Sequence, residues 1–340
     1  MDTPTLLWHG EYLWLSCTFL LVSNESGVFS VDIVVPCFNE EDSLPTFFIS
    51  YLHLIKNHPN YAFNIIIVDN GSTDETLTLA REFIATTKDG ICLELSRNFG
   101  KEASLTAGLE RSTADVVIPI DADLQDPIEL IPILLARWAQ TGADVVLARR
   151  KTREEDTRFR RSISAIYISL FRKLSDVDLH PNVGEFRLMT RKVVQAFSTM
   201  PERQRFVRGM LAWLGFKIEI VDYIRPARAK GKSSFNFFRL FELGIEGITA
   251  FSVKPLRMAI VFGLTIATAS GMYALYIFIL AINNKTPIPG YASLLIAVLF
   301  LGGMQLLFLG VIGEYLGRTL LESKARPNYV IREVYQGHGL

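Results

Sequence analysis

Two long stretches in the second half of the sequence contain no Asp, Glu, Lys or Arg. They run from Met258 to Ile282 and from Pro289 to Gly313. Each has about 25 residues, enough for a helix to cross a hydrocarbon layer of roughly 30 Å. Core helices of soluble proteins rarely run so far without a polar face. The two stretches therefore predict a pair of transmembrane helices, and two long buried core helices are the alternative.

Lysine and arginine are unevenly distributed around this pair. The intervening turn, residues 283–288, carries one cation, Lys285. The outer flanks carry many more, at Lys230, Lys232, Arg239, Lys254, Arg257, Arg318, Lys324, Arg326 and Arg332. Because cationic residues favour the cytoplasmic side of a membrane, both flanks are expected there. We predict a multi-pass hairpin at 255–317 followed by a cytoplasmic tail at 318–340.

Two further segments lie outside the expected soluble domain, which we place at 30–229. Between 230 and 254, apolar side chains recur at helical spacing, which is typical of amphipathic helices resting on a membrane surface. A helix packed on the soluble domain is the alternative. At the other end, the apolar run from Leu6 to Val22 is interrupted by His9 and Glu11. We interpret residues 1–29 as a dispensable extension.

Composition excludes two classes of protein. Lys+Arg and Asp+Glu number 35 each, so the formal net charge is zero. Nucleic-acid binding needs a surplus of cations to neutralise phosphates, so no nucleic acid is expected as a partner. Hydrophobic residues make up 49% of the chain and charged residues 21%, which excludes a disordered chain.

Short β-branched runs alternate with helical patterns through the soluble part. We expect strands at 31–35, 63–68, 91–95, 116–120 and 144–148, and helices at 43–56, 74–86, 101–111 and 127–140. This alternation predicts an α/β fold with a mostly parallel sheet covered on both faces. Ligands of such sheets bind at the carboxyl ends of the strands.

Polar side chains follow those strand ends. The most informative run, Asp121-Ala122-Asp123-Leu124-Gln125-Asp126, comes after the fourth expected strand. Two carboxylates and an amide oxygen suit Mg²⁺ or Mn²⁺, which typically also take phosphate oxygens as ligands. The chain has neither a Gly-x-Gly-x-x-Gly turn after a strand nor a Walker loop. A nucleotide would therefore be held by a metal and carboxylates. For the run from Asp69 to Asp74, a purely structural role as a turn and helix cap is the alternative.

Several motifs together resemble family 2 glycosyltransferases with a GT-A fold, of the polyisoprenyl-phosphate, bactoprenol glucosyltransferase type. The first four end the expected strands: Val35-Pro36-Cys37-Phe38-Asn39-Glu40-Glu41, Val68-Asp69-Asn70-Gly71-Ser72, Ser96-Arg97-Asn98-Phe99-Gly100-Lys101-Glu102 and Ile120-Asp121-Ala122-Asp123-Leu124-Gln125-Asp126-Pro127. The narrower match rests on Val183-Gly184-Glu185-Phe186-Arg187-Leu188-Met189, Pro201-Glu202-Arg203 and Gly313-Glu314-Tyr315-Leu316-Gly317-Arg318. The resemblance covers roughly Val31 to Ile331.

The resemblance implies roles for particular residues. Those matching the nucleotide pocket are Pro36, Glu40, Asp69 and Asp121, and those matching the metal site are Asp123 and Gln125. Those matching acceptor-phosphate contacts are Arg149, directly after the fifth expected strand, Arg160 and Ser164. The residues expected to carry catalysis are Asp121, Asp123, Arg149 and Glu185. For most of the basic cluster at 149–161, a solvated face or a contact with anionic lipid is the alternative.

The sequence departs from the family pattern at three positions. Asn70 stands where Asp is usual, Glu185 replaces the Asp of a Gly-Asp-Phe-Arg-Leu run, and Ser234 replaces a Lys. Glu185 lengthens a carboxylate of the active site by one methylene, and a displacement of about 1 Å can matter greatly for catalysis. A base or positioning role for Glu185 is therefore open to question.

The implied reaction is an inverting transfer of a hexose, most simply glucose, from a UDP-sugar to undecaprenyl phosphate. Mg²⁺ or Mn²⁺ at Asp121 and Asp123 would neutralise charge on the leaving phosphates. The acceptor phosphate, with a second pKa of about 6, needs hardly any base. The implied setting is the cytoplasmic face of the bacterial inner membrane. Membrane lipids, a flippase, a downstream glycosyltransferase and a second copy of the chain are further expected partners.

Three alternatives remain. A processive polysaccharide synthase shares the GT-A motifs, but Gly209 stands where its sugar-stacking tryptophan would be. A transferase for aminoarabinose or mannose would carry nearly the same features. A non-catalytic membrane scaffold is disfavoured by the intact Asp121, Asp123 and Gln125.

Overall fold

Most of the soluble domain and both long apolar helices can be followed along the chain. The computed structural model describes residues 28–151, 180, 182–203, 205–224, 254–282 and 291–337. The expected amino-terminal extension before residue 28, the amphipathic segment up to residue 253 and the turn at 283–288 lie outside these residues.

An eight-stranded sheet forms the centre of the soluble domain, in the order β7-β5-β6-β4-β1-β2-β3-β8. Its strands are β1 (Phe29–Cys37), β2 (Tyr61–Asp69), β3 (Ile91–Leu95), β4 (Val116–Pro119), β5 (Val145–Arg150), β6 (Val183–Thr190), β7 (Ile218–Tyr223) and β8 (Ile331–Gln336). The first five correspond to the expected strands. The α/β fold predicted from the sequence is confirmed.

The sheet is mostly parallel, with two exceptions. β1 pairs in parallel with β2 and β4, β2 with β3, and β5 with β7. β6 runs antiparallel between β4 and β5, and β8 runs antiparallel to β3 at one edge. The sequence did not predict β6, β7 or β8, because each carries two charged residues within the strand and none is a continuous apolar run.

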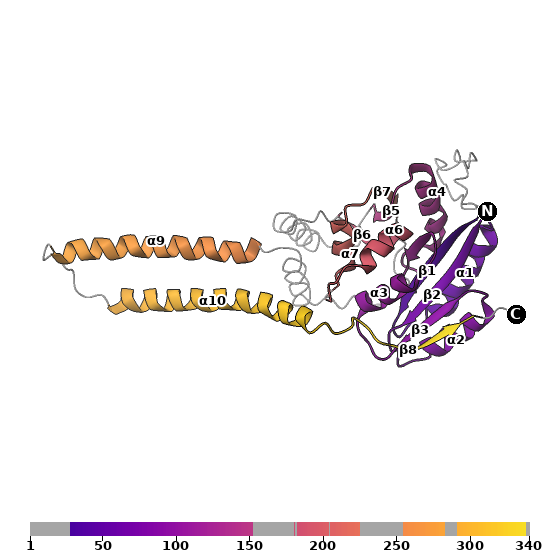
Figure 1. The fold of residues 1–340 in the computed structure, drawn as a ribbon, viewed down its shortest axis with the longest axis horizontal. Helices are drawn as coiled ribbons and strands as arrows, with labels where there is room; N and C mark the ends of the chain where they lie inside the picture. The colour runs from indigo at the N-terminus through magenta and orange to yellow at the C-terminus, as the bar shows by residue number, and fades with distance from the viewer. Residues whose placement is uncertain are drawn as a thin grey trace, which may run out of the picture.

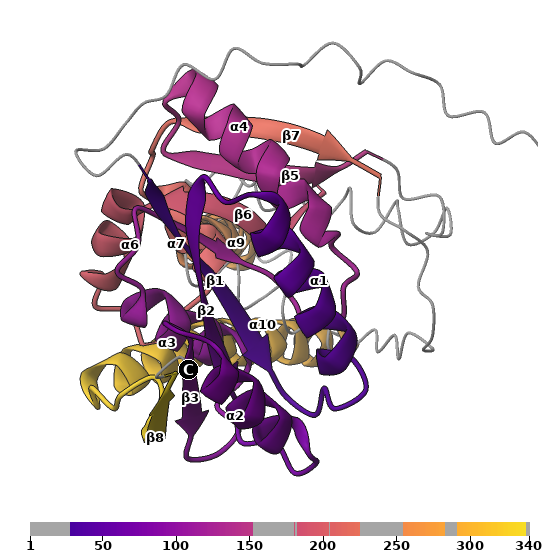
Figure 2. The same ribbon diagram turned by 90° about the vertical axis from the view of Figure 1, so that its right-hand side faces the viewer.

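Helices cover both faces of the sheet (Figure 2). The helices that pack on one face are α1 (Leu44–Asn57), α2 (Thr76–Thr86), η1 (Ile128–Leu130) and α4 (Ile131–Thr141). Those that pack on the other are α3 (Lys101–Arg111), α6 (Arg191–Ser198) and α7 (Val207–Trp213). Alternating side chains of each strand point to opposite faces, so Ile33 and Val35 join the first core and Val34 the second.

Close packing of α3 fixes the position of its amino-terminal end. A Cβ added to Gly108 would lie 2.3 Å from Cγ1 of Val34, so the helix approaches β1 at a distance that only glycine allows. The loop that leads into α3, residues 96–100, therefore ends at a fixed point beside the carboxyl end of β4.

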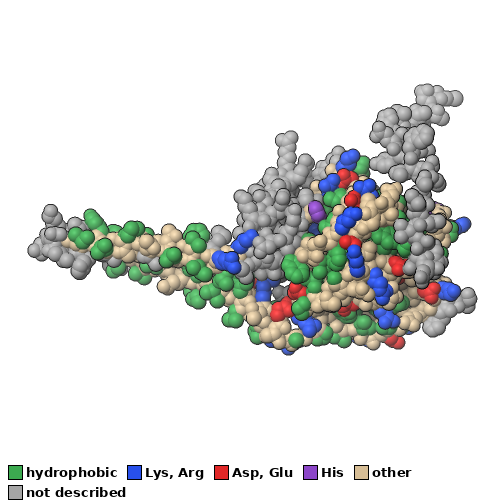
Figure 3. Space-filling model, turned by 45° about the horizontal axis from the view of Figure 1, so that its top comes forward, with side chains coloured by type: hydrophobic (Ala, Val, Ile, Leu, Met, Phe, Trp, Pro, Cys, Tyr) green, Lys and Arg blue, Asp and Glu red, His purple; other side chains and the backbone are tan. Residues whose placement is uncertain are grey.

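Two long helices, α9 (Lys254–Ile282) and α10 (Tyr291–Ser323), lie side by side and project from the soluble domain (Figure 1). Apolar side chains cover much of their surface (Figure 3), including Val261 and Leu264, which are exposed. By length and composition, one helical segment among the described residues, Phe300–Ser323, could cross a membrane, and Ala259–Tyr273 is a shorter apolar helix. α9 includes the whole predicted span 258–282, and α10 includes the second predicted span from residue 291 onward.

The chain after the hairpin returns to the catalytic sheet. α10 continues past the expected boundary at 317 to Ser323, and the Arg318 guanidinium pairs with Glu314 one turn earlier. β8 then pairs with β3, and its Arg332 and Tyr335 side chains both donate to the buried Glu94 carboxylate, each at 2.9 Å. The segment expected to be a tail thus includes an edge strand of the sheet.

Candidate active site

The carboxyl ends of the parallel strands lie along one edge of the sheet and carry the expected site residues. Pro36 lies near the end of β1 and Asp69 ends β2, while Asp121 follows β4. The backbone N–H of Asn70 donates to the carbonyl of Cys37 at 2.9 Å, which joins the first two loops. Segments distant in sequence therefore meet at one place.

Asp69 is a buried carboxylate with one unused oxygen. Its Oδ2 accepts hydrogen bonds from the backbone N–H groups of Gly71 and Ser72, at 3.1 and 3.2 Å. Its Oδ1 is buried and has no hydrogen-bond partner among the described residues. Burial raises the pKa of Asp69, although the contacts with Ser72 and Gly71 partly offset it. A buried acceptor without a partner is costly, so a ligand that donates a hydrogen bond to it would be favoured.

Asn70 explains one departure from the family pattern. Its Nδ2 donates to Oδ1 of Asn98 at 3.1 Å, and its Oδ1 accepts from the N–H of Phe99 at 2.9 Å. Oδ1 of Asn98 also accepts from the N–H of Gly100 at 2.9 Å. An aspartate at position 70 could not donate a hydrogen bond to Oδ1 of Asn98. If the Asn98 amide rotated to donate to that aspartate instead, it would lose its hydrogen bond from the N–H of Gly100. Asn70 thus ties the Asp69 loop to the loop before α3.

Replacing Asn70 with aspartate is expected to lower the free energy of unfolding by about 1–3 kcal/mol, because a carboxylate oxygen of residue 70 would then face the amide oxygen of Asn98. Thermal unfolding of the purified protein checks this. Asn60→Asp, which changes an exposed amide just before β2 and away from this loop, serves as the control. Equal unfolding temperatures for Asn70→Asp and the unaltered protein would contradict the assigned contact.

Glu40 links the first loop to the Asp121 run. Its backbone N–H donates to Oγ1 of Thr76 at 2.7 Å, which sets the loop against the start of α2. Burial raises the pKa of the Glu40 carboxyl, a contact with Ser43 lowers it, and the nearby charges of Asp123 and Asp121 raise it further. The Glu40 carboxyl therefore lies within electrostatic range of both aspartates.

The Asp121 carboxylate is paired with a cation from α3. The Lys101 ammonium lies 2.6 Å from Oδ1 and 2.7 Å from Oδ2 of Asp121. Asp123 is exposed, and its Oδ1 accepts from the N–H of Gln125 at 3.0 Å. Leu124, between them, has a positive φ of 53°, which turns the chain sharply here. Burial raises the pKa of Asp121, whereas Lys101 acts in the opposite direction.

The end of the run is held by a buried contact that the sequence did not predict. The Tyr223 hydroxyl of β7 donates to Oδ1 of Asp126, and Nε of Arg150 donates to the Tyr223 oxygen at 3.1 Å. The Arg150 NH2 group lies 3.5 Å from the same Asp126 oxygen. Burial and the bond to Asp126 raise the pKa of Tyr223 to about 12. These contacts fix the Asp121 run against the sheet.

Arg149 lies within β5 and not after it, which corrects the expected strand end. Adjacent residues of a strand point to opposite faces, so Arg149 points away from the side occupied by Arg150 and Asp126. Its Nε and NH2 groups donate to the two carboxylate oxygens of Asp222, at 2.6 and 3.0 Å. Arg160 and Ser164, the other expected acceptor contacts, lie outside the described residues.

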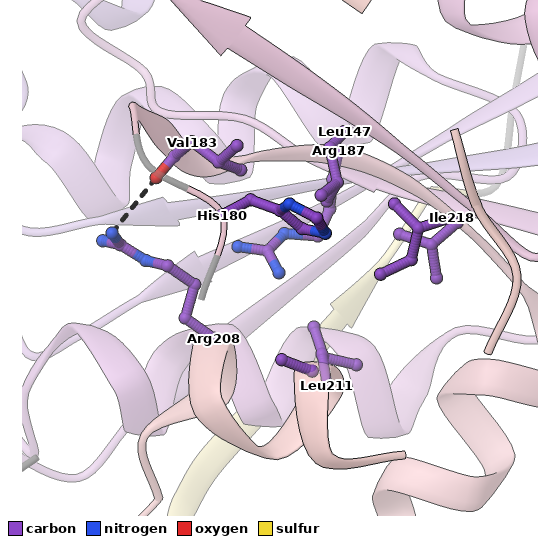
Figure 4. A pocket seen from close by; sticks show the side chains of 9 residues that line it. Leu147, His180, Val183, Arg187, Arg208, Leu211 and Ile218 are labelled. Atoms are coloured by element: carbon purple, nitrogen blue, oxygen red, sulfur yellow. Dashed lines mark hydrogen bonds between the residues drawn. The ribbon is translucent and has the colours of Figure 1, made fainter. Parts of the chain in front are cut away.

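Glu185, partly buried on β6, lies in a cluster of charges with Arg187 of the same strand and Arg208 of α7. Its Oε1 accepts from Nε of Arg208 at 2.9 Å, and its Oε2 lies 3.3 Å from Arg187. Burial alone would raise the pKa of Glu185, but the two arginines outweigh burial and lower it. Figure 4 shows Arg187 and His180 turned into the same small pocket, of about 30 Å³, above Leu211. Both carboxylate oxygens are therefore engaged by arginine, an arrangement unlike that of a free base.

Glu102, on α3, is a partly buried carboxyl beside this cluster, and the sequence did not identify it. Burial and the charge of Glu185 raise the pKa of Glu102 to about 7, although its contact with the N–H of Val207 opposes this. Between the ordinary glutamate pKa of 4.5 and about 7, the folded protein binds a proton that the unfolded chain releases. Stability contributed by this proton is present at low pH and is lost as the pH rises through about 7.

Glu102→Gln is therefore expected to raise the unfolding temperature, relative to the unaltered protein, more at pH 8 than at pH 5. The amide oxygen still accepts from Val207, so the fold is retained. Unfolding temperatures of both proteins at the two pH values check this, with Glu129→Gln at an exposed site as the control. A Glu102→Gln effect independent of pH would contradict the assignment.

The oxygen-rich run from Asp121 to Asp126 fits a hard divalent cation that is bound partly by the protein and partly by substrate oxygens. Asp121 already holds the Lys101 ammonium with both oxygens, so the site selects a positive charge. Among the described residues, no group of three or more His, Cys, Asp or Glu is arranged to hold a metal by itself. Mg²⁺ and related ions are commonly held by one or two carboxylates together with substrate phosphates. Asp121, Asp123 and Gln125 supply donors of that kind.

A mostly parallel sheet with these acidic loops at the carboxyl ends of its strands has the GT-A architecture, which is a fold of glycosyltransferases. The family model of glycosyl transferase family 2 matches residues 32–197, and a model described as the GtrB C-terminal hairpin matches residues 254–319. The chain belongs to glycosyl transferase family 2. The family and the enzyme class expected from the sequence are thereby confirmed.

Relatives match along nearly their whole length. The prophage bactoprenol glucosyl transferase homolog of Escherichia coli strain K12 is 42% identical over 304 residues, which are 89% of this chain and 99% of the relative. The bactoprenol glucosyl transferase of Shigella phage SfX is 43% identical over 302 residues, 89% of this chain and 98% of the relative. The putative glycosyltransferase CsbB of Bacillus subtilis strain 168 is 38% identical over 303 residues, 89% of this chain and 91% of the relative.

Proposed function

We propose that the protein transfers glucose from UDP-glucose to undecaprenyl phosphate, with inversion at the anomeric carbon. The observation that carries this proposal is the similarity, over about nine-tenths of the chain and including the hairpin, to proteins named bactoprenol glucosyl transferases. The loop geometry at the sheet edge supports a nucleotide-sugar donor.

The uracil base would bind between the loops after β1 and β2. Oδ1 of Asp69 is buried and lacks a partner in the part of the chain that the structure describes, and the imide N–H of uracil is a donor that would satisfy it. Pro36, half-buried at the end of β1, supplies an apolar wall, and Glu40 lies toward the Asp121 run. Base and diphosphate would thus lie along one line from Asp69 to Asp121.

The donor diphosphate would lie at Asp121 and Asp123. These two carboxylates, with Gln125, would hold a divalent cation together with the phosphate oxygens, and that cation would neutralise charge on the leaving nucleoside diphosphate. Tyr223 and Arg150 hold Asp126, so the run is preorganised before the donor arrives. Preorganised charges stabilise a transition state without reorganisation during the reaction.

The acceptor phosphate is its own nucleophile. With a second pKa of about 6 it is largely ionised at neutral pH, so a general base is not required. Arg149 would exchange its exposed partner Asp222 for the acceptor phosphate, and Arg160 and Ser164 would contact the same group. Exposed ion pairs contribute little free energy, so this exchange costs little. Glu185 would act by holding Arg208 in place.

The helices α9 and α10 would both cross the bacterial inner membrane, with the catalytic domain on the cytoplasmic side. The cations that flank the pair support this orientation, since the connecting turn carries only Lys285. A lipid-linked acceptor with its phosphate at the membrane surface would then lie near the domain.

Purified full-length protein, incubated with undecaprenyl phosphate, Mg²⁺ or Mn²⁺ and a panel of UDP-sugars and GDP-mannose, tests the proposal. Mass spectrometry of the lipid is expected to show addition of one hexose from UDP-glucose, and NMR a β-linked sugar phosphate. Turnover of a different donor alone would revise the sugar. An α-linked product would contradict inversion, and no turnover of any donor would overturn the proposal.

A further inference from the structure

The fold alone does not explain why Lys101 is paired with Asp121. It is the first residue of α3, its side chain is 52% exposed, and its ammonium lies within 2.7 Å of both Asp121 oxygens. Exposed ion pairs contribute little to stability, so this contact does little to hold α3 to β4. The ammonium instead lies where a cation bound to Asp121 would be.

Hydrogen bonds hold the loop before Lys101, whereas the Lys101 side chain is exposed. Asn70 and Asn98 exchange hydrogen bonds that also engage Phe99 and Gly100, directly before Lys101. The close packing at Gly108 fixes the helix that follows. A lysine ends in a compact charge on a flexible four-carbon stem, so its ammonium can swing while its Cα stays in place.

We propose that Lys101 binds Asp121 in place of a divalent cation in the donor-free enzyme. When the metal-bound donor arrives, the Lys101 side chain moves so that its ammonium contacts the donor diphosphate. This inference rests on the proposed function. It has two consequences. Lys101 competes with a metal when no donor is present, and Lys101 strengthens nucleotide binding when metal and nucleotide are both present.

Metal binding without nucleotide tests the first consequence. Titration of the full-length protein with Mn²⁺ alone, followed by electron paramagnetic resonance of free Mn²⁺, is expected to show about fivefold tighter binding for Lys101→Met. Lys101→Arg keeps the charge and is expected to bind Mn²⁺ like the unaltered protein. Lys192→Met is a matched control, because it removes a lysine paired with another aspartate, Asp144, away from this site.

Nucleotide binding tests the second consequence. In the presence of saturating Mn²⁺, calorimetry is expected to show UDP binding about tenfold weaker for Lys101→Met, because a charged hydrogen bond to phosphate is lost. Lys101→Arg is expected to retain most of the affinity, and Lys192→Met all of it.

The outcomes separate this inference from the proposed function. If Lys101→Met binds Mn²⁺ alone no more tightly than the unaltered protein, or binds UDP equally well, the role of Lys101 is wrong while the proposed reaction stands. If Asp123→Asn does not weaken Mn²⁺ binding in any background, the metal site is wrong and the role of Lys101 falls with it, whereas the proposed transfer is decided by the panel of donors. Unchanged unfolding temperatures show that each variant is folded.

Discussion

Asp123→Asn is expected to lower the rate of glucosyl transfer by at least about a hundredfold, while the protein remains folded. The amide oxygen still accepts the hydrogen bond from Gln125, so the loop keeps its shape. The negative charge that would hold a cation beside the leaving diphosphate is lost, and loss of one preorganised electrostatic contact typically costs a factor of about 10²–10³. Initial rates with UDP-glucose and undecaprenyl phosphate measure the effect.

Glu129→Gln is the matched control for this variant. Glu129 is an exposed carboxylate on the 3-10 turn that follows the run, so neutralising it changes the net charge equally without touching the site. Its rate is expected to stay within about twofold of the unaltered protein, as is usual for surface substitutions. Transfer by Asp123→Asn at the rate of the control would show that Asp123 has no part in catalysis.

Ending the chain after Pro327, ahead of β8, is expected to destabilise the catalytic domain by about 4 kcal/mol, because the edge of β3 would lose its antiparallel partner and the buried Glu94 would lose both donors. A buried carboxylate left without partners costs several kcal/mol, and an open strand edge invites aggregation. Thermal unfolding and size-exclusion chromatography of the purified protein measure both effects.

A milder variant keeps this prediction testable if the shortened chain does not fold. Arg332→Met with Tyr335→Phe leaves the strand in place but removes both donors to Glu94. It is expected to cost about 2 kcal/mol, because Arg332 is exposed and its pair is screened. The same two changes in a Glu94→Gln background are expected to cost less. An equal cost in both backgrounds would contradict the assigned role of Glu94.

Local patterns were sufficient to predict the first half of the sheet. The expected strand at 91–95 and the expected helix at 101–111 coincide with β3 and α3. Both are short apolar or amphipathic runs bounded by turn residues, so their limits follow from periodicity. The same rule placed Asp69 and Asp121 at the carboxyl ends of two strands, and the structure brings them to one end of the sheet, with β1 between the two strands.

Residues whose position depends on distant partners could not be predicted. Arg187 is buried within β6 because Glu185 and the carbonyl of Gly184 satisfy it, and no local pattern reveals a buried arginine. β5 continues two residues beyond its expected end, which turns Arg149 and Arg150 to opposite faces. Tyr223 meets Asp126 only because β7 pairs with β5.

The return of β8 to the sheet has a consequence for the number of membrane crossings. β7 precedes the two long helices and β8 follows them, yet both strands belong to one hydrogen-bonded sheet. The chain must therefore come back to the side of the membrane that it left, which requires an even number of crossings. A passage by α10 alone would separate β8 from its partner β3. The two-crossing hairpin that we propose satisfies this parity, and so does a chain that lies wholly on one side.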